Sequence, residues 1–65
     1  MQITLNGAQY DTAAGSVAEL LRELNIEVGR VAVEVNFEVV RKVDFPTRRL
    51  GQGDRVEIVN FVGGG

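Results

Sequence analysis

The sequence predicts an α+β fold in which one main helix packs on a mixed sheet of about five strands. Several short segments alternate apolar and polar residues or are rich in branched side chains, which is typical of half-buried strands. A single segment has its apolar residues at helical spacing instead. The segments that we expect to be strands are residues 1–5, 8–12, 31–35, 38–41 and 55–62.

Two of the expected connections are short turns. Asn6-Gly7 joins the first two segments, and this dipeptide is typical of a hairpin turn in which both central residues need a positive φ. Asn36-Phe37 is expected to form the turn between the third and fourth strands. Phe37 is an unusual residue for such a turn, because bulky side chains tolerate a positive φ poorly.

The helix is expected to begin at Ser16, whose hydroxyl can accept a hydrogen bond from the N–H of Glu19 while the Glu19 side chain reaches back to the N–H of Ser16. Asn25 is expected to end it in a left-handed conformation, with Ile26 closing against the helix. A helix this short is unstable alone and must pack on the sheet. Its apolar stripe consists of Val17, Leu20, Leu21 and Leu24.

Residues 43–50 show no clear period and are expected to form a connection with at most one helical turn, anchored by Phe45 and Leu50. Pro46 should restrict Phe45 to extended conformations. A core of ten apolar residues follows from these assignments. We expect it to contain Ile3, Leu5, Val17, Leu20, Leu21, Leu24, Val33, Leu50, Val56 and Ile58.

Composition limits the classes of function. The 65 residues allow one domain with a small core, and the net charge of −2 argues against nucleic-acid binding. Histidine and cysteine are absent, so the commonest metal ligands and general base are missing. We therefore expect neither a bound cofactor nor enzymatic activity. The sequence has no apolar run of membrane-spanning length and no signal-peptide pattern, so we expect a cytoplasmic protein without membrane contact.

Gly63, Gly64 and Gly65 follow the last strand directly and end the sequence. We expect residues 1–62 to form one domain and residues 63–65 a flexible tail. Glycine lets such a tail enter a narrow site. Its carboxylate is ionised at neutral pH and needs activation before it can react, for instance as an acyl adenylate. The alternative is a frayed chain end without function.

Val59 and Phe61 are the other candidate site residues. If Val56 and Ile58 point into the core, Val59 and Phe61 lie on the opposite face of the last strand, near the tail. An apolar pair at that position suits a partner surface that guides the tail. Alternatively, the connection around Phe45 covers the pair.

A hairpin, a crossing helix and further strands make up the β-grasp (ubiquitin-like) arrangement, in which the first and last strands are central and parallel. The whole chain resembles the ThiS family, the ubiquitin-like sulfur carriers of thiamine thiazole biosynthesis. Phe37 departs from this family, which usually has glycine there. The resemblance is carried by residues 1–3, 20–24, 31–36 and above all 53–65, which join a Gly-Asp turn, a strand and the terminal glycines.

The resemblance implies that an E1-like adenylyltransferase of the ThiF type uses ATP to adenylate Gly65. A sulfur donor such as a cysteine desulfurase would then allow conversion to a thiocarboxylate, from which a ThiG-like thiazole synthase receives the sulfur. Gly65 would react, and Gly63, Gly64, Val59 and Phe61 would contact partners. The alternatives are a MoaD-like carrier for molybdopterin synthesis and a ubiquitin-like modifier joined to lysines.

Overall fold

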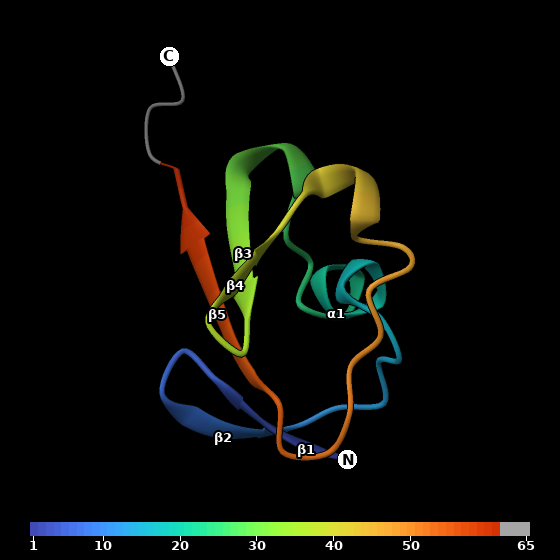
Figure 1. The fold of residues 1–65 in the computed structure, drawn as a ribbon, viewed down its shortest axis with the longest axis vertical. Coiled ribbons are helices and arrows are strands. Elements are labelled where there is room, and N and C mark those ends of the chain that lie inside the picture. Colours follow the sequence, from blue (N-terminus) through green and yellow to red (C-terminus); the bar gives the residue numbers. More distant parts are fainter. Residues whose placement is uncertain (62–65) are drawn as a thin grey trace.

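The computed structural model describes residues 1–61, and residues 62–65 lie outside the described part. A single sheet with the strand order β2-β1-β5-β3-β4 carries the helix α1 on one face (Figure 1). Two short 3-10 turns, Val28–Arg30 and Lys42–Asp44, precede β3 and follow β4. The elements are β1 (Gln2–Leu5), β2 (Ala8–Asp11), α1 (Val17–Glu23), β3 (Val31–Val35), β4 (Glu38–Val40) and β5 (Arg55–Asn60).

The sheet is mixed, as predicted. The first and last strands, β1 and β5, lie side by side and parallel, with Leu5 opposite Val56. The pairs β1–β2, β3–β4 and β3–β5 are antiparallel. Because β1 and β3 flank it, β5 is the central strand, and the chain that leaves its end starts from the middle of the sheet.

Both predicted turns have the expected backbone. Asn6 and Gly7 have φ values of 48° and 84°, and Asn36 and Phe37 have φ values of 52° and 70°. The guanidinium carbon of Arg55 lies 4.8 Å from the centre of the Phe37 ring. A cation–π contact at an exposed site contributes about 0.5–1 kcal/mol, which offsets part of the strain of an aromatic residue at positive φ.

The N-terminus of α1 confirms one half of the predicted capping box and corrects the other. The Ser16 hydroxyl accepts from the N–H of Glu19 at 3.2 Å. The Glu19 carboxylate, however, accepts from the N–H of Gly15 at 2.7 Å and not from Ser16. Ser16 is extended and bridged to Arg49, and this entry into the helix brings the N–H of Gly15 next to the carboxylate.

The C-terminus of α1 ends as the sequence predicts. Asn25 is left-handed, with a φ of 60°. The N–H groups of Asn25 and Ile26 donate to the carbonyls of Arg22 and Leu21, at 3.1 and 2.9 Å. This is the pair of bonds that closes a helix when the residue after the cap is left-handed. The helix therefore stops at Glu23, one residue before the end of the predicted apolar stripe.

Phe45 corrects one prediction. Its backbone is helical (φ −53°, ψ −43°) and not extended, although Pro46 follows it. The N–H of Phe45 donates to the carbonyl of Lys42 at 3.1 Å, and its own carbonyl accepts from the N–H of Ala18 at 2.9 Å. The ring is buried. These bonds and the burial of the ring outweigh the bias that proline imposes on the residue before it.

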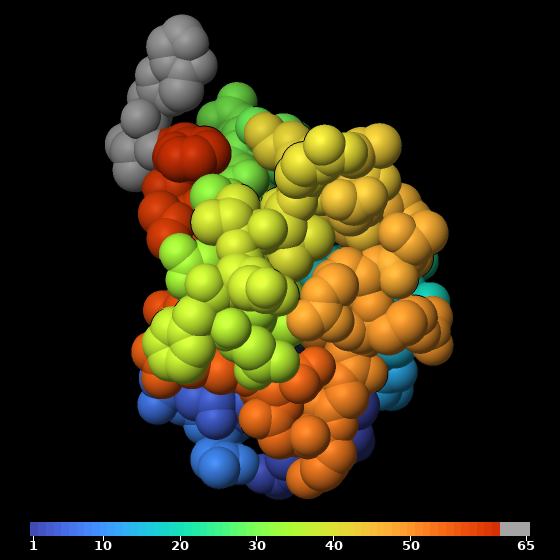
Figure 2. All heavy atoms as spheres, viewed as in Figure 1, coloured from blue at the N-terminus to red at the C-terminus, as the bar shows by residue number. Residues whose placement is uncertain are grey.

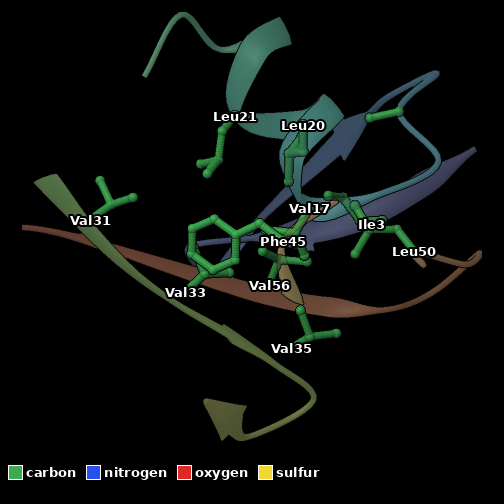
Figure 3. Packing of buried hydrophobic residues seen from close by; sticks show 11 residues of the cluster. Ile3, Val17, Leu20, Leu21, Val31, Val33, Val35, Phe45, Leu50 and Val56 are labelled. Atoms are coloured by element: carbon green, nitrogen blue, oxygen red, sulfur yellow. The ribbon is translucent and has the colours of Figure 1, made fainter. Parts of the chain in front are cut away.

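The core lies between α1 and the sheet, and Figure 3 shows the Phe45 ring within it. Three residues predicted to be buried, Leu5, Leu24 and Ile58, are only partly buried, because they lie around an apolar groove at one end of the sheet. The buried apolar residues are Ile3, Ala14, Val17, Leu20, Leu21, Val31, Val33, Val35, Phe45, Leu50 and Val56.

Two asparagine side chains from the hairpin turns hold β5 in place. Asn6 accepts from the N–H of Ile58 at 2.7 Å and donates to the Ile58 carbonyl at 3.2 Å. Asn36 accepts from the N–H of Arg55 at 3.0 Å and donates to the Asp54 carboxylate, also at 3.0 Å. The central strand is thus held near its start by Asn36, on the β3 side, and beyond its middle by Asn6, on the β1 side.

Candidate functional site

The end of β5 is the part of the predicted site that the structure describes. The N–H of Phe61 donates to the carbonyl of Arg30 at 2.8 Å, so the last described residue is tied to the residue before β3. Gly63, Gly64 and Gly65 lie outside the described residues. The flexible tail and the domain end at residue 62 therefore stay predictions.

Val59 and Phe61 lie on the sheet face opposite the core, as the alternation of β5 predicts. Their side chains are 56% and 50% exposed, whereas Val56 is fully buried. Phe45 packs between α1 and the sheet, on the other face (Figure 3). The alternative in which the connection around Phe45 covers the pair is therefore wrong.

Two further apolar side chains near the β3–β4 turn are exposed, although neither was predicted to be a site residue. Phe37 is 76% and Val39 71% exposed. Val39 pairs with Glu34, which in turn pairs with Glu57, so Val39 shares a face with Val59. Figure 2 shows the red end of β5 at the surface beside the green and yellow-green segments of β3 and β4. An aromatic residue in a tight turn is the sequence signal that could have identified this region.

A hydrogen-bonded cluster with shifted pKa values lies away from the end of β5, between β2 and α1. The Tyr10 hydroxyl donates to the Glu23 carboxylate at 2.6 Å, and the buried Thr12 hydroxyl donates to the same group at 2.8 Å. The bond from Tyr10 lowers the pKa of Glu23 below its usual 4.5 and raises the pKa of Tyr10 above 10.0. This cluster ties the hairpin to the helix and is structural.

Neither a metal cluster nor a membrane span is found in the described part. Within residues 1–61, no group of three or more acidic, histidine or cysteine side chains could hold a metal ion. No helix among these residues is both long and apolar enough to cross a membrane.

A family model matches residues 3–65, which is nearly the whole chain and includes the glycines. Its description is the ThiS family. The chain belongs to the ThiS family. A relative of nearly equal length, the sulfur carrier protein ThiS of Thermus thermophilus, is 35% identical over 63 residues, and the match covers 97% of this chain and 98% of that protein. A second relative of nearly equal length, from Bacillus subtilis, is also named sulfur carrier protein ThiS and is 35% identical over 65 residues.

A solved structure supports the same assignment. The crystal structure of the thiamine biosynthesis protein ThiS from Geobacter metallireducens superposes with a TM-score of 0.86 at 35% identity, and the match covers 100% of both chains. The five-stranded mixed sheet with one helix is therefore the β-grasp fold of this family, as predicted.

Another relative places a ThiS-like segment inside a larger protein. The thiazole synthase of Paramagnetospirillum magneticum is 39% identical over 66 residues. The match covers all of this chain but only 20% of that protein. In that relative, a segment similar to this family member is therefore joined covalently to the rest of a thiazole synthase.

Proposed function

We propose that the chain carries sulfur on the carboxylate of Gly65 for the synthesis of the thiazole ring of thiamine. An E1-like adenylyltransferase of the ThiF type transfers AMP from ATP to this carboxylate and releases pyrophosphate. A persulfide from a donor such as a cysteine desulfurase then displaces AMP and forms an acyl disulfide. A thiol reduces this disulfide, which leaves the thiocarboxylate on Gly65 and the donor sulfur in a new disulfide with the thiol. The observation that carries the proposal is that the family match includes all three glycines and runs through Gly65.

The chemistry follows from the properties of the chain end. A carboxylate anion is a poor electrophile, and adenylation supplies a leaving group. Three extended glycines reach roughly 10 Å, so they can carry the carboxylate into a cleft that excludes the folded domain. Because glycine has no Cβ, the walls of that cleft can close on the backbone.

The acceptor of the sulfur is a thiazole synthase of the ThiG type. The relative from Paramagnetospirillum magneticum supports this partner, because its name is thiazole synthase and one part of it resembles the whole chain. Val59 and Phe61 offer exposed apolar surface on the strand that leads to the glycines. We propose that they contact the partners while the tail is bound.

The tail is tested by ATP–pyrophosphate exchange with the cognate adenylating enzyme. Deleting Gly65 shortens the reach by about 3.3–3.6 Å. Replacing Gly64 with a bulky residue introduces a side chain where the cleft is narrow. Both variants should fold like the original protein and lose exchange. Persistent exchange in both would show that the Gly65 carboxylate is not the reacting group.

The exposed pair is tested separately, by affinity for the adenylating enzyme and the synthase. Val59→Ser and Phe61→Ser should weaken binding to at least one partner and leave the melting temperature nearly unchanged, because both side chains are half exposed. Val43→Ser is the matched control, since Val43 is 69% exposed but lies in the turn after β4. If all three variants bound both partners with equal affinity, Val59 and Phe61 would not belong to the binding site.

A further inference from the structure

Among residues 1–61, the second half of β5 has a neighbouring strand on one side only. The register with β1 ends where Leu5 pairs with Val56, and the chain then turns away at Asn6. Beyond this point the Asn6 side chain replaces the β1 backbone, because it bonds to both the N–H and the carbonyl of Ile58. In Figure 1, the hairpin of β1 and β2 lies at the lower end of β5, and β3 runs alongside the upper part of β5.

The register of β3 and β5 shows which backbone groups face this open side. The N–H of Asn36 bonds to the carbonyl of Arg55, and the N–H of Phe61 bonds to the carbonyl of Arg30. Backbone groups in an antiparallel pair point at the partner at every second residue, so the odd-numbered residues of β5 face β3. The N–H and the carbonyl of Asn60 therefore point away from β3, past the end of β1.

An apolar groove of about 330 Å³ lies next to this open edge. It lies on the helix side of the sheet, between the end of α1 and the ends of the strands. Asn6 and Asn60 supply its polar lining. Its apolar lining comes from Leu5, Leu24, Ile26, Val31 and Ile58, which include the three predicted core residues that are only partly buried.

An open backbone edge beside an apolar groove suits one class of ligand. An extended peptide can bond to the edge as an added strand and place a side chain in the groove. We propose that an extended segment of the thiazole synthase binds beside Asn60 in this way, with one apolar side chain in the groove. This inference rests on the proposed function, and the covalent link between a ThiS-like segment and a thiazole synthase in a relative is the reason to choose the synthase.

The added strand has a consequence for the sulfur transfer. It would flank β5 on the side that β1 leaves open and hold the last residues before the glycines between two strands. That constraint reduces the directions in which the Gly65 thiocarboxylate can leave the domain, and positioning of this kind promotes reaction between two bound groups. Asn60 is thus a positioning residue that acts through its backbone.

Hydrogen exchange of single amides, measured by NMR with and without the synthase, tests the inference. In the free protein the Asn60 amide should exchange fast, and the Ile58 amide, which bonds to Asn6 at 2.7 Å, should be protected. Addition of the synthase should protect Asn60. A chain of this length can be made by chemical synthesis, so an N-methyl group can replace the Asn60 amide hydrogen alone. We expect this change to weaken synthase binding roughly tenfold or more, since it removes a donor and adds bulk at the edge.

Two controls separate the edge from the side chains. Asn60→Ala keeps the backbone donor and removes only the side chain from the groove lining, so it should weaken synthase binding less than N-methylation does. Ile26→Lys places a charge in the groove and should weaken binding, whereas Val28→Lys, at an exposed position outside the groove lining, should not. The melting temperature of each variant shows whether the fold is intact.

The outcomes distinguish this inference from the proposed function. If the synthase binds but Asn60 stays unprotected and N-methylation has no effect, the added strand is wrong and the carrier role stands. If protection of Asn60 appears at high protein concentration without synthase, the occupant is a second copy of the chain and the inference falls. If the synthase does not bind the thiocarboxylate form at all, both the inference and the proposed partner are wrong.

Discussion

At the scale of single residues, the depth of burial determines what a truncation costs. Leu21 is fully buried against the sheet, and Ile58 lies at the border of the groove. We expect Leu21→Ala to lower the free energy of unfolding by about 2–5 kcal/mol, and Ile58→Ala to lower it by less, because part of the Ile58 side chain already contacts water. Equilibrium urea unfolding measures both. Equal losses would contradict the assignment of Ile58 to a groove.

Residues in periodic segments were predictable, and residues in irregular segments were not. Leu20 and Leu21 follow from helical spacing alone. Phe45 was expected only to anchor a connection, yet it is fully buried in the core and its backbone is helical. Its position depends on bonds to Lys42 and Ala18, and no local pattern shows that the start of α1 will lie against this carbonyl.

At the scale of elements, the contact between β2 and α1 should make stability depend on pH. The bond from Tyr10 lowers the pKa of Glu23 below 4.5. As the pH falls, the Glu23 carboxylate is therefore protonated in the unfolded chain before it is protonated in the folded chain. The contribution of the Glu23 carboxylate to stability is therefore complete above pH 4.5 and is lost as the pH falls through the pKa that Glu23 has in the folded protein. For Tyr10 the pH dependence runs in the opposite direction, because its pKa is raised. The contribution of Tyr10 to stability is complete below pH 10.0 and is lost as the pH rises through the pKa that Tyr10 has in the folded protein.

Tyr10→Phe tests this contact. The variant should be less stable than the original protein at neutral pH, and the difference in free energy of unfolding should shrink as the pH falls below 4.5. Urea unfolding across this pH range provides the measurement. A difference that is constant with pH would show that the lost contact is packing and not the bond to the Glu23 carboxylate.

The strands and both turns could be predicted, because alternation and turn-forming asparagines are local signals. The asparagine contacts to β5 could not. Asn6 and Ile58 are 52 positions apart, and only the parallel pairing of β1 with β5 brings them together. The same pairing ends before Asn60 and leaves the β1 side of β5 open there. The groove and the open edge beside it could therefore not be predicted either.

At the scale of the whole molecule, the fold presents the end of β5 at the middle of a sheet whose outer face is exposed around Val59 and Phe61. The alternation of β5 was sufficient to predict which face these two residues occupy. The exposed side chains of Phe37 and Val39 were not recognised, because a three-residue strand after a turn has too few positions to show which side faces water.

The central claim is that the carboxylate of Gly65 becomes a thiocarboxylate, and the intact mass of the protein purified from its own cells tests it most directly. We expect a fraction of the chains to be heavier by the difference between one sulfur and one oxygen, and fragmentation to place this difference at the terminal glycine. Alkylation of the thiocarboxylate should shift that fraction alone. If Gly65 were found only as an unmodified carboxylate during active thiamine synthesis, or joined to lysine side chains of other proteins, the sulfur-carrier account would be contradicted.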